Sequence, residues 1–144
     1  MPKIEKITKQ TENPYVNLYL VEGKNKVDHP FRYYVASRAK TMEALKIKTK
    51  KNTPDGVLMY SLYGEKRDKI VLVRQYRVSI DDYIYEFPAG LVESGEEFHE
   101  AAVREMHEET GLTFHPLKVD PCYEKPFFTT IGMTDEACSA VYGW

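Results

Sequence analysis

Carboxylates gather in one stretch of this chain, between Gly90 and Leu112. Its acidic residues include Glu96, Glu97, Glu105, Glu108 and Glu109, with Arg104 among them. At about 100° per residue, a helix would place the last three glutamates on one side, where like charges three or four residues apart repel. They also lie near the helix C-terminus, where negative charge is unfavourable. Such local conflicts are expected at functional sites, and a divalent cation would relieve this one.

The residue types in this stretch indicate metal-assisted chemistry. Carboxylate oxygens select hard cations, so the sequence predicts Mg²⁺ or Mn²⁺ here. Arg104 precedes Glu108 by four residues, close enough on a helix to hold and orient that carboxylate. A glutamate kept ionised in this way can ligate a metal or position a water for attack on phosphorus. The alternative is a solvated acidic helix face without chemistry.

Strands and one helix must position these side chains. β-Branched and aromatic runs predict strands at Tyr15–Val21, Phe31–Ala36, Val57–Tyr63, Lys69–Tyr76, Tyr83–Phe87 and Ala137–Trp144. Ser94 and Glu97 have the spacing of a capping box, which predicts a helix starting near Gly95, and Gly111 is placed to end it. The apolar stripe of that helix is predicted to be Ala102, Val103 and Met106. The first two strands suggest an N-terminal hairpin, which needs another surface to be stable.

Composition and length limit the possible domain organisation, partners and localisation of the protein. The 144 residues suit one main domain, which we expect to divide at the turn after Asn52 into an N-terminal strand extension, residues 1–52, and a core, residues 53–144. A net charge of −2 argues against nucleic acid as a partner. No apolar run is long enough for a membrane span and no signal peptide begins the chain, which favours the cytoplasm. The chain ends on an apolar strand at Trp144, with no turn or cap beyond it, which suggests that part of the core is missing.

The acidic stretch resembles the Nudix box, a pattern written G-x5-E-x7-R-E-U-x-E-E-x-G-U, in which U is a bulky apolar residue. Every fixed position is filled, by Gly90, Glu96, Arg104, Glu105, Met106, Glu108, Glu109, Gly111 and Leu112. The resemblance implies an α/β fold, the Nudix α/β/α sandwich with a mixed sheet, to which this chain adds the N-terminal hairpin. It also implies a hydrolase dependent on Mg²⁺ or Mn²⁺. By position, Glu105, Glu108 and Glu109 become metal ligands, and Arg104 and Glu108 belong to the catalytic set.

The residues that flank the box make the resemblance more specific, because they match one subgroup of the family. Residues 75–77 and 86–90 look like the flanks found in ADP-ribose pyrophosphatases and related nucleotide-sugar hydrolases. The resemblance implies that the carbonyl of Ala89 is a further metal ligand. It also implies that Arg77 and Glu86 hold the phosphates and ribose of the substrate. For Arg77, the alternative of a surface charge at the end of a strand weighs equally.

A second segment, residues 132–136, resembles the loop that delivers one more catalytic carboxylate in this subgroup. The resemblance makes Glu136 the candidate general base, with Asp135 second; an ordinary polar loop is the alternative. Ile131 stands where ADP-ribose hydrolases usually have a proline, which leaves the choice of sugar open. This subgroup usually has further strands and a C-terminal helix beyond the position of Trp144, so the resemblance implies that the core lacks them. The hairpin matches strands that this subgroup exchanges between the subunits of a homodimer. On that analogy, Arg32 or Tyr34 reaches the adenine pocket of a partner subunit.

The expected function is hydrolysis of ADP-ribose to AMP and ribose 5-phosphate, with a small nucleotide sugar as the partner rather than nucleic acid or membrane. One alternative is a hydrolase of another nucleotide sugar or of a dinucleotide. The other is a nucleotide-sugar sensor that binds without cleaving.

Overall fold

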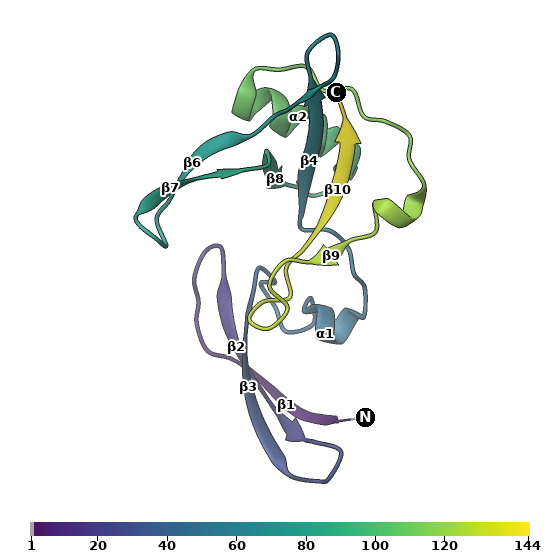
Figure 1. Cartoon of the computed structure of the whole chain (residues 1–144). Helices are drawn as coiled ribbons and strands as arrows, with labels where there is room; N and C mark the ends of the chain where they lie inside the picture. The colour runs from purple at the N-terminus through teal and green to yellow at the C-terminus, as the bar shows by residue number, and fades with distance from the viewer. Residues whose placement is uncertain (1) are drawn as a thin grey trace. The chain divides into compact units, whose positions relative to one another are not determined.

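A computed structural model describes residues 2–144, which divide into two compact units (Figure 1). The first unit contains the residues up to Asn52 together with Phe128–Glu136, and the second contains Thr53–Phe127 together with Ala137–Trp144. In the described part of the chain, no helix has the length and apolar character needed to cross a membrane. The box and its flanks therefore lie in the second unit, whereas the segment that carries Glu136 lies in the first.

The first unit is built on a three-stranded antiparallel sheet in the order β1-β2-β3, followed by a short helix. Its elements are β1 (Lys3–Lys9), β2 (Asn17–Lys24), β3 (Pro30–Ser37) and α1 (Lys46–Thr49). The predicted hairpin is confirmed as β2 and β3. Strand β1 was not predicted, because its side chains are mostly exposed and polar and leave no apolar alternation to detect.

The second unit contains a mixed sheet, as predicted. Strand β4 (Gly56–Tyr63) runs parallel to β10 (Ala137–Gly143) and antiparallel to β8 (Ala89–Leu91) and β5 (Lys69–Ile70). The order along the sheet is β5-β4-β10-β9, in which β9 is Phe127–Phe128. A short 3-10 helix, η1 (Pro121–Tyr123), precedes β9.

The prediction of one strand over Lys69–Tyr76 is wrong. The run divides into β5, which pairs with β4, and β6 (Val73–Arg77), which pairs with β7 (Asp82–Glu86) as a separate antiparallel ribbon. Strand-forming residues continue through the break, so composition alone cannot show that the pairing partner changes.

Helix α2 (Phe98–Thr110) packs on β4 and β8 (Figure 1). Its buried residues are Ala101, Ala102 and Met106, which meet a core formed by Val57, Met59, Phe114 and Val141. The prediction that Val103 belongs to the buried stripe is wrong, because Val103 is 38% exposed and Ala101 takes its place. Ala101 lies one turn before Glu105, so the face that packs on the sheet also carries that glutamate.

The helix begins later than the capping box predicts. Glu97 is the N-cap, and its carboxylate accepts a hydrogen bond of 2.8 Å from the amide of His99. The start near Gly95 is therefore wrong, since Gly95 has φ +85° and lies in a turn. The end is confirmed, because Gly111 has φ 72° and its amide donates to the carbonyl of His107 at 2.8 Å.

Candidate active site

Arg104 is the centre of a charged network on α2. Its Nε and Nη2 atoms each donate to one oxygen of Glu96 at 2.9 Å, a bidentate pair. Nη1 donates to Glu105 Oε1 at 2.8 Å and to Glu108 Oε2 at 3.3 Å. Nη2 also donates to the carbonyl of Leu91 on β8 at 3.0 Å. The predicted contact with Glu108 is confirmed, but the shorter bonds show that Arg104 mainly orients Glu105 and Glu96.

The bidentate pair keeps Glu96 and Arg104 charged. Hydrogen bonds from Arg104, and next from the amide of Glu93, lower the pKa of Glu96 to about 2. The bonds to Glu96 and then to Glu105 raise the pKa of Arg104. Because a planar guanidinium forks between the carboxylates, the orientation of Glu105 is tied to that of Glu96 at the start of the helix.

Replacing Arg104 by lysine should lower kcat about 10- to 100-fold while the protein remains folded. One ammonium group cannot reproduce the fork that holds Glu96 and Glu105, and small misplacements of catalytic groups cost rates of this order. Steady-state kinetics together with circular dichroism test this expectation. A kcat equal to that of the wild type would show that the orientation of Glu105 does not depend on the guanidinium.

Glu109 lies against the strand that precedes the box. The amide of Ala89 donates to Glu109 Oε2 at 3.1 Å. Although Glu109 is exposed as a residue, its pKa is raised, first by burial of the carboxylate and then by the charges of Glu105 and Glu86. The Ala89 amide and the charge of Arg77 act in the opposite direction. Negative charge at Glu109 is therefore incompletely compensated by its protein neighbours.

Gly90, in the middle of β8, makes room for the box. Its backbone pairs with Val57 of β4, and a Cβ built on Gly90 would overlap the carboxylate end of Glu105. The glycine therefore lets the Glu105 side chain lie directly against the strand. This explains the glycine at the first box position by close approach rather than by an unusual turn, because Gly90 is not among the glycines with positive φ.

Arg77 and Glu86, the two flank residues expected to hold substrate, hold each other. Arg77 Nη2 lies 2.7 Å from Glu86 Oε1, and Arg77 Nε donates to Glu86 Oε2 at 3.3 Å. Glu86 Oε1 is buried and receives no hydrogen bond of favourable angle despite the nearby cation. The pair forms within the β6–β7 ribbon. The sequence does not predict this ribbon, because strand-forming residues continue from Lys69 to Tyr76 without a break. The role of the pair toward substrate stays a prediction.

The donor atoms fit a hard divalent cation in their chemistry. Within residues 2–144, no three acidic, histidine or cysteine side chains converge closely enough to enclose a metal. Arg104 holds Glu105 and Glu108 instead, and the Ala89 amide holds Glu109. The donors are oxygens, and a buried Glu86 oxygen lacks a hydrogen bond. Burial, and then the charges of Glu105 and Glu86, raise the pKa of Glu109, so a cation beside it would stabilise its ionised form. The metal roles of Ala89 and the three box glutamates stay predictions.

Two predicted site residues lie in the first unit. Glu136 Oε1 accepts a hydrogen bond from Arg38 Nε at 2.9 Å, and its Oε2 accepts one from Thr129 Oγ1 at 3.1 Å. Arg38 therefore orients the candidate base, a role that nothing in its local sequence indicates. Arg32 on β3 is 66% exposed at its side chain, with Nε 3.4 Å from Glu22 of β2. The base and adenine roles stay predictions.

His99 joins the start of α2 to the segment before β9, a contact that sequence reasoning did not predict. Its Nε2 lies 2.8 Å from Glu124 Oε1, and its Nδ1 lies 3.1 Å from the Glu97 carboxylate. Burial lowers the pKa of His99, but hydrogen bonds with Glu124 and then Glu97 raise it more, so the pKa lies above its ordinary value. A doubly protonated ring can donate to both carboxylates, whereas a neutral ring can donate to only one.

This contact predicts a pH dependence of stability. Because the pKa of His99 is raised on folding, its contribution is complete below the unfolded pKa of about 6.5 and is lost as pH rises through the folded pKa. We expect a loss of about 0.5–1 kcal/mol across that window, a small value because the side chain is partly exposed. Thermal unfolding of the wild type and of His99→Gln at pH 5.5 to 8.5 tests this. The variant should lack this part of the slope, and parallel curves would contradict the assignment.

Known proteins resemble this chain over the region of the site. The model of the NUDIX domain family matches residues 52–142. An ADP-ribose pyrophosphatase of Saccharomyces cerevisiae is 35% identical over 80 residues, covering 54% of this chain and 35% of that protein. An ADP-sugar pyrophosphatase of Mus musculus is 36% identical over 87 residues, covering 58% of this chain and 40% of that protein. An ADP-ribose pyrophosphatase of Bacillus subtilis is 44% identical over 61 residues, covering 42% of this chain and 33% of that protein.

The fold is shared with a solved structure as well. The crystal structure of an ADP compounds hydrolase superposes with a TM-score of 0.73 at 19% identity, covering 99% of this chain and 66% of that one. The predicted α/β fold is thereby confirmed. The matches span only 33–40% of the length of these curated relatives. With the family match over residues 52–142 and every box position filled, the chain belongs to the NUDIX domain family.

Proposed function

We propose that this protein hydrolyses the pyrophosphate bond of a nucleoside diphosphate linked to a sugar, with ADP-ribose giving AMP and ribose 5-phosphate. The observation that carries the proposal is the network in which Arg104 presents Glu105 beside Glu109 on one face of α2. Relatives named ADP-ribose pyrophosphatase and ADP-sugar pyrophosphatase support the substrate class. We also expect the protein to be cytoplasmic and to form a homodimer. Each chain would consist of an N-terminal extension, residues 1–52, and a catalytic core, residues 53–144.

Nudix hydrolases generally use divalent metal ions, and we assign Mg²⁺, with Mn²⁺ as its substitute. Glu105, Glu108, Glu109 and the carbonyl of Ala89 would hold it. When bound, the cation withdraws charge from the phosphate oxygens and so makes phosphorus easier to attack. Arg104 orients Glu105, and the Ala89 amide orients Glu109.

The remaining assignments follow the path of the reaction. Arg77 binds a phosphate oxygen of the substrate, and Glu86 accepts hydrogen bonds from the ribose. Glu136 takes one proton from the attacking water at a carboxylate oxygen, while the water oxygen bonds to phosphorus and the bond to the bridging oxygen breaks. The leaving phosphate departs with that oxygen, and its charge is offset by Arg77. Arg32 contacts the adenine in the pocket of a partner subunit.

A substrate panel tests the proposal. The full chain is incubated with Mg²⁺ and ADP-ribose, UDP-glucose, NADH, diadenosine polyphosphates or oxidised deoxynucleoside triphosphates, and the products are separated by chromatography. Turnover greatest with ADP-ribose supports the assignment, and preference for another member reassigns the sugar or base. Tight binding of ADP-ribose without product over hours would replace the hydrolase by a sensor. No turnover of any member would refute the enzyme.

A further inference from the structure

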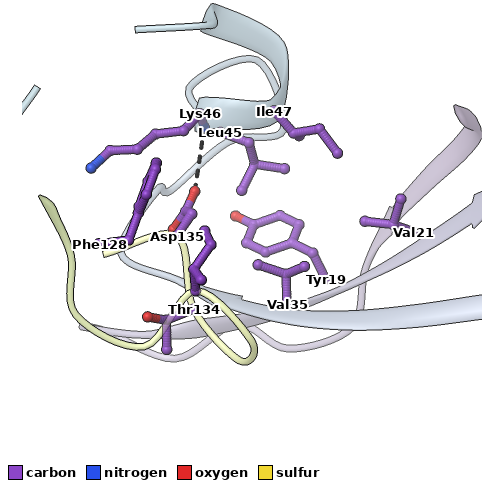
Figure 2. Close-up of a pocket in the computed structure, with 10 residues that line it drawn as sticks. Tyr19, Val21, Val35, Leu45, Lys46, Ile47, Phe128, Thr134 and Asp135 are labelled. Atoms are coloured by element: carbon purple, nitrogen blue, oxygen red, sulfur yellow. Dashed lines mark hydrogen bonds between the residues drawn. The ribbon is translucent and has the colours of Figure 1, made fainter. Parts of the chain in front are cut away.

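A cavity of about 310 Å³ lies inside the first unit (Figure 2). The residues that line it include Tyr19 and Val35 of the β2–β3 hairpin, Leu45, Phe128 and Ile131. This volume falls near the lower limit of small-molecule pockets, which measure roughly 300–1,000 Å³. Since the wall is predominantly apolar, the cavity suits a compact apolar body rather than a phosphate or a sugar.

The polar groups of the wall differ in how much hydrogen-bonding capacity they retain. The Tyr19 hydroxyl donates to the carbonyl of Ala39 at 2.6 Å, which uses its proton. The Asp135 carboxylate accepts from the amide of Lys46 at 3.3 Å, the contact drawn as a dashed line in Figure 2. A carboxylate offers about four acceptor positions, so Asp135 can accept a further hydrogen bond. The cavity therefore favours a ligand with an N–H donor.

The cavity also joins two parts of the first unit that are far apart in sequence. The segment Phe128–Glu136 is attached to β3 by main-chain bonds, in which the Ala36 amide donates to the carbonyl of Met133 at 2.9 Å and the Asp135 amide donates to the carbonyl of Ala36 at 3.4 Å. A molecule between this segment and the β2–β3 hairpin would touch both. Its binding would add contacts that hold the segment in place.

We propose that this cavity binds a small aromatic molecule bearing a ring N–H, and that binding fastens Phe128–Glu136 to the β2–β3 hairpin. Side chains that face an unfilled space forgo dispersion contacts, and apolar cavities of comparable character take up benzene-sized molecules. Asp135 supplies the acceptor, and Glu136 follows it directly in the chain. The binding itself does not depend on nucleotide hydrolysis, so the two claims fail or succeed separately.

Indole is the probe that tests the site. In NMR titrations of the full chain, we expect nuclear Overhauser effects between indole ring protons and both the Val35 methyls and the Tyr19 ring. N-Methylindole has the same aromatic body without the donor, and we expect its binding to be about tenfold weaker, because a hydrogen bond to a charged acceptor is lost. Equal affinity of the two molecules, or contacts confined to the second unit, would overturn the proposal.

A pair of matched variants locates the binding. Val35→Phe puts ring atoms into the cavity and should weaken indole binding at least about tenfold. Leu18→Phe adds a ring on the opposite face of the same hairpin, because neighbouring strand residues alternate in direction, and should leave the affinity unchanged. Unchanged affinity in both variants would refute the site. If Val35→Phe does not fold, the nuclear Overhauser effects between indole and the wild-type protein show whether indole binds in the cavity.

Discussion

Glu109→Gln is expected to reduce kcat by roughly 10³-fold or more without loss of the fold. The substitution removes one carboxylate from the set assigned to the metal, and such electrostatic stabilisation is worth several kcal/mol in the transition state. The Ala89 amide can still donate to the glutamine side-chain oxygen, so the helix keeps its contact with β8. Steady-state hydrolysis of ADP-ribose and thermal unfolding measure the two effects.

The same substitution should leave the midpoint of thermal unfolding unchanged or raise it. The pKa of Glu109 is raised by burial and by the charges of Glu105 and Glu86, which means that its ionised form is disfavoured in the folded protein. Loss of activity with gained stability is typical of a residue kept for function. Glu100→Gln, an exposed change in the first turn of the same helix, is the matched control and should preserve kcat. Near-wild-type activity of Glu109→Gln would refute the ligand assignment.

Gly90→Ala should lower kcat about 100-fold and cost about 1–3 kcal/mol of stability. The new methyl group would overlap the end of the Glu105 side chain, so Glu105 must move and its 2.8 Å hydrogen bond from Arg104 must break. A displacement of a catalytic group by about 1 Å is enough for a rate loss of this order. Because the overlap involves a side chain rather than backbone, the variant should still fold.

Two further variants test whether displacement of Glu105 causes the lower kcat and stability of Gly90→Ala. Gly132→Ala is the stability control, because a Cβ at Gly132 would meet nothing within 4 Å and its φ is not positive. Combining Gly90→Ala with Glu105→Asp shortens the displaced side chain and should restore stability but not activity. If Gly90→Ala alone hydrolyses ADP-ribose at the wild-type rate, the position of Glu105 does not limit the reaction.

The sequence predicts those parts of the fold whose signals are local. The β2–β3 hairpin, β4, β10 and the left-handed end of α2 at Gly111 were predictable, because strand propensity and helix capping act over a few residues. Strand β1 was not, since its mostly exposed side chains leave no apolar face and its pairing with β2 is made by backbone atoms.

The start of α2 shows why local signals can mislead. Ser94 and Glu97 match a capping box, yet Glu97 itself caps the helix, and the Glu96 carboxylate is bound by Arg104 two turns later. Choosing between these arrangements requires the position of Arg104 relative to β8, where it binds the carbonyl of Leu91. The position of Arg104 relative to β8 depends on tertiary packing, so the local sequence around the start of the helix cannot reveal it.

In the candidate site, too, the sequence predicts local contacts within the helix but not contacts between distant segments. Box spacing alone indicated that Glu105, Glu108 and Glu109 share a helix side and that Arg104 reaches Glu108. It could not indicate the pairing of Arg77 with Glu86 within a ribbon, or that of Glu136 with Arg38, because both depend on which strands and segments become neighbours. Arg77, Glu86 and Glu136 were therefore identified as candidate residues, whereas their contacts and the part played by Arg38 were not.

The most direct measurement is ³¹P NMR of ADP-ribose incubated with the full chain and Mg²⁺. We expect the pyrophosphate resonances to be replaced by those of AMP and ribose 5-phosphate in equal amounts. Addition of EDTA should stop the conversion, and the Glu109→Gln variant should show none on the same timescale. Pyrophosphate resonances that persist with the wild type, or conversion that continues with EDTA or in the variant, would contradict metal-dependent hydrolysis at the box.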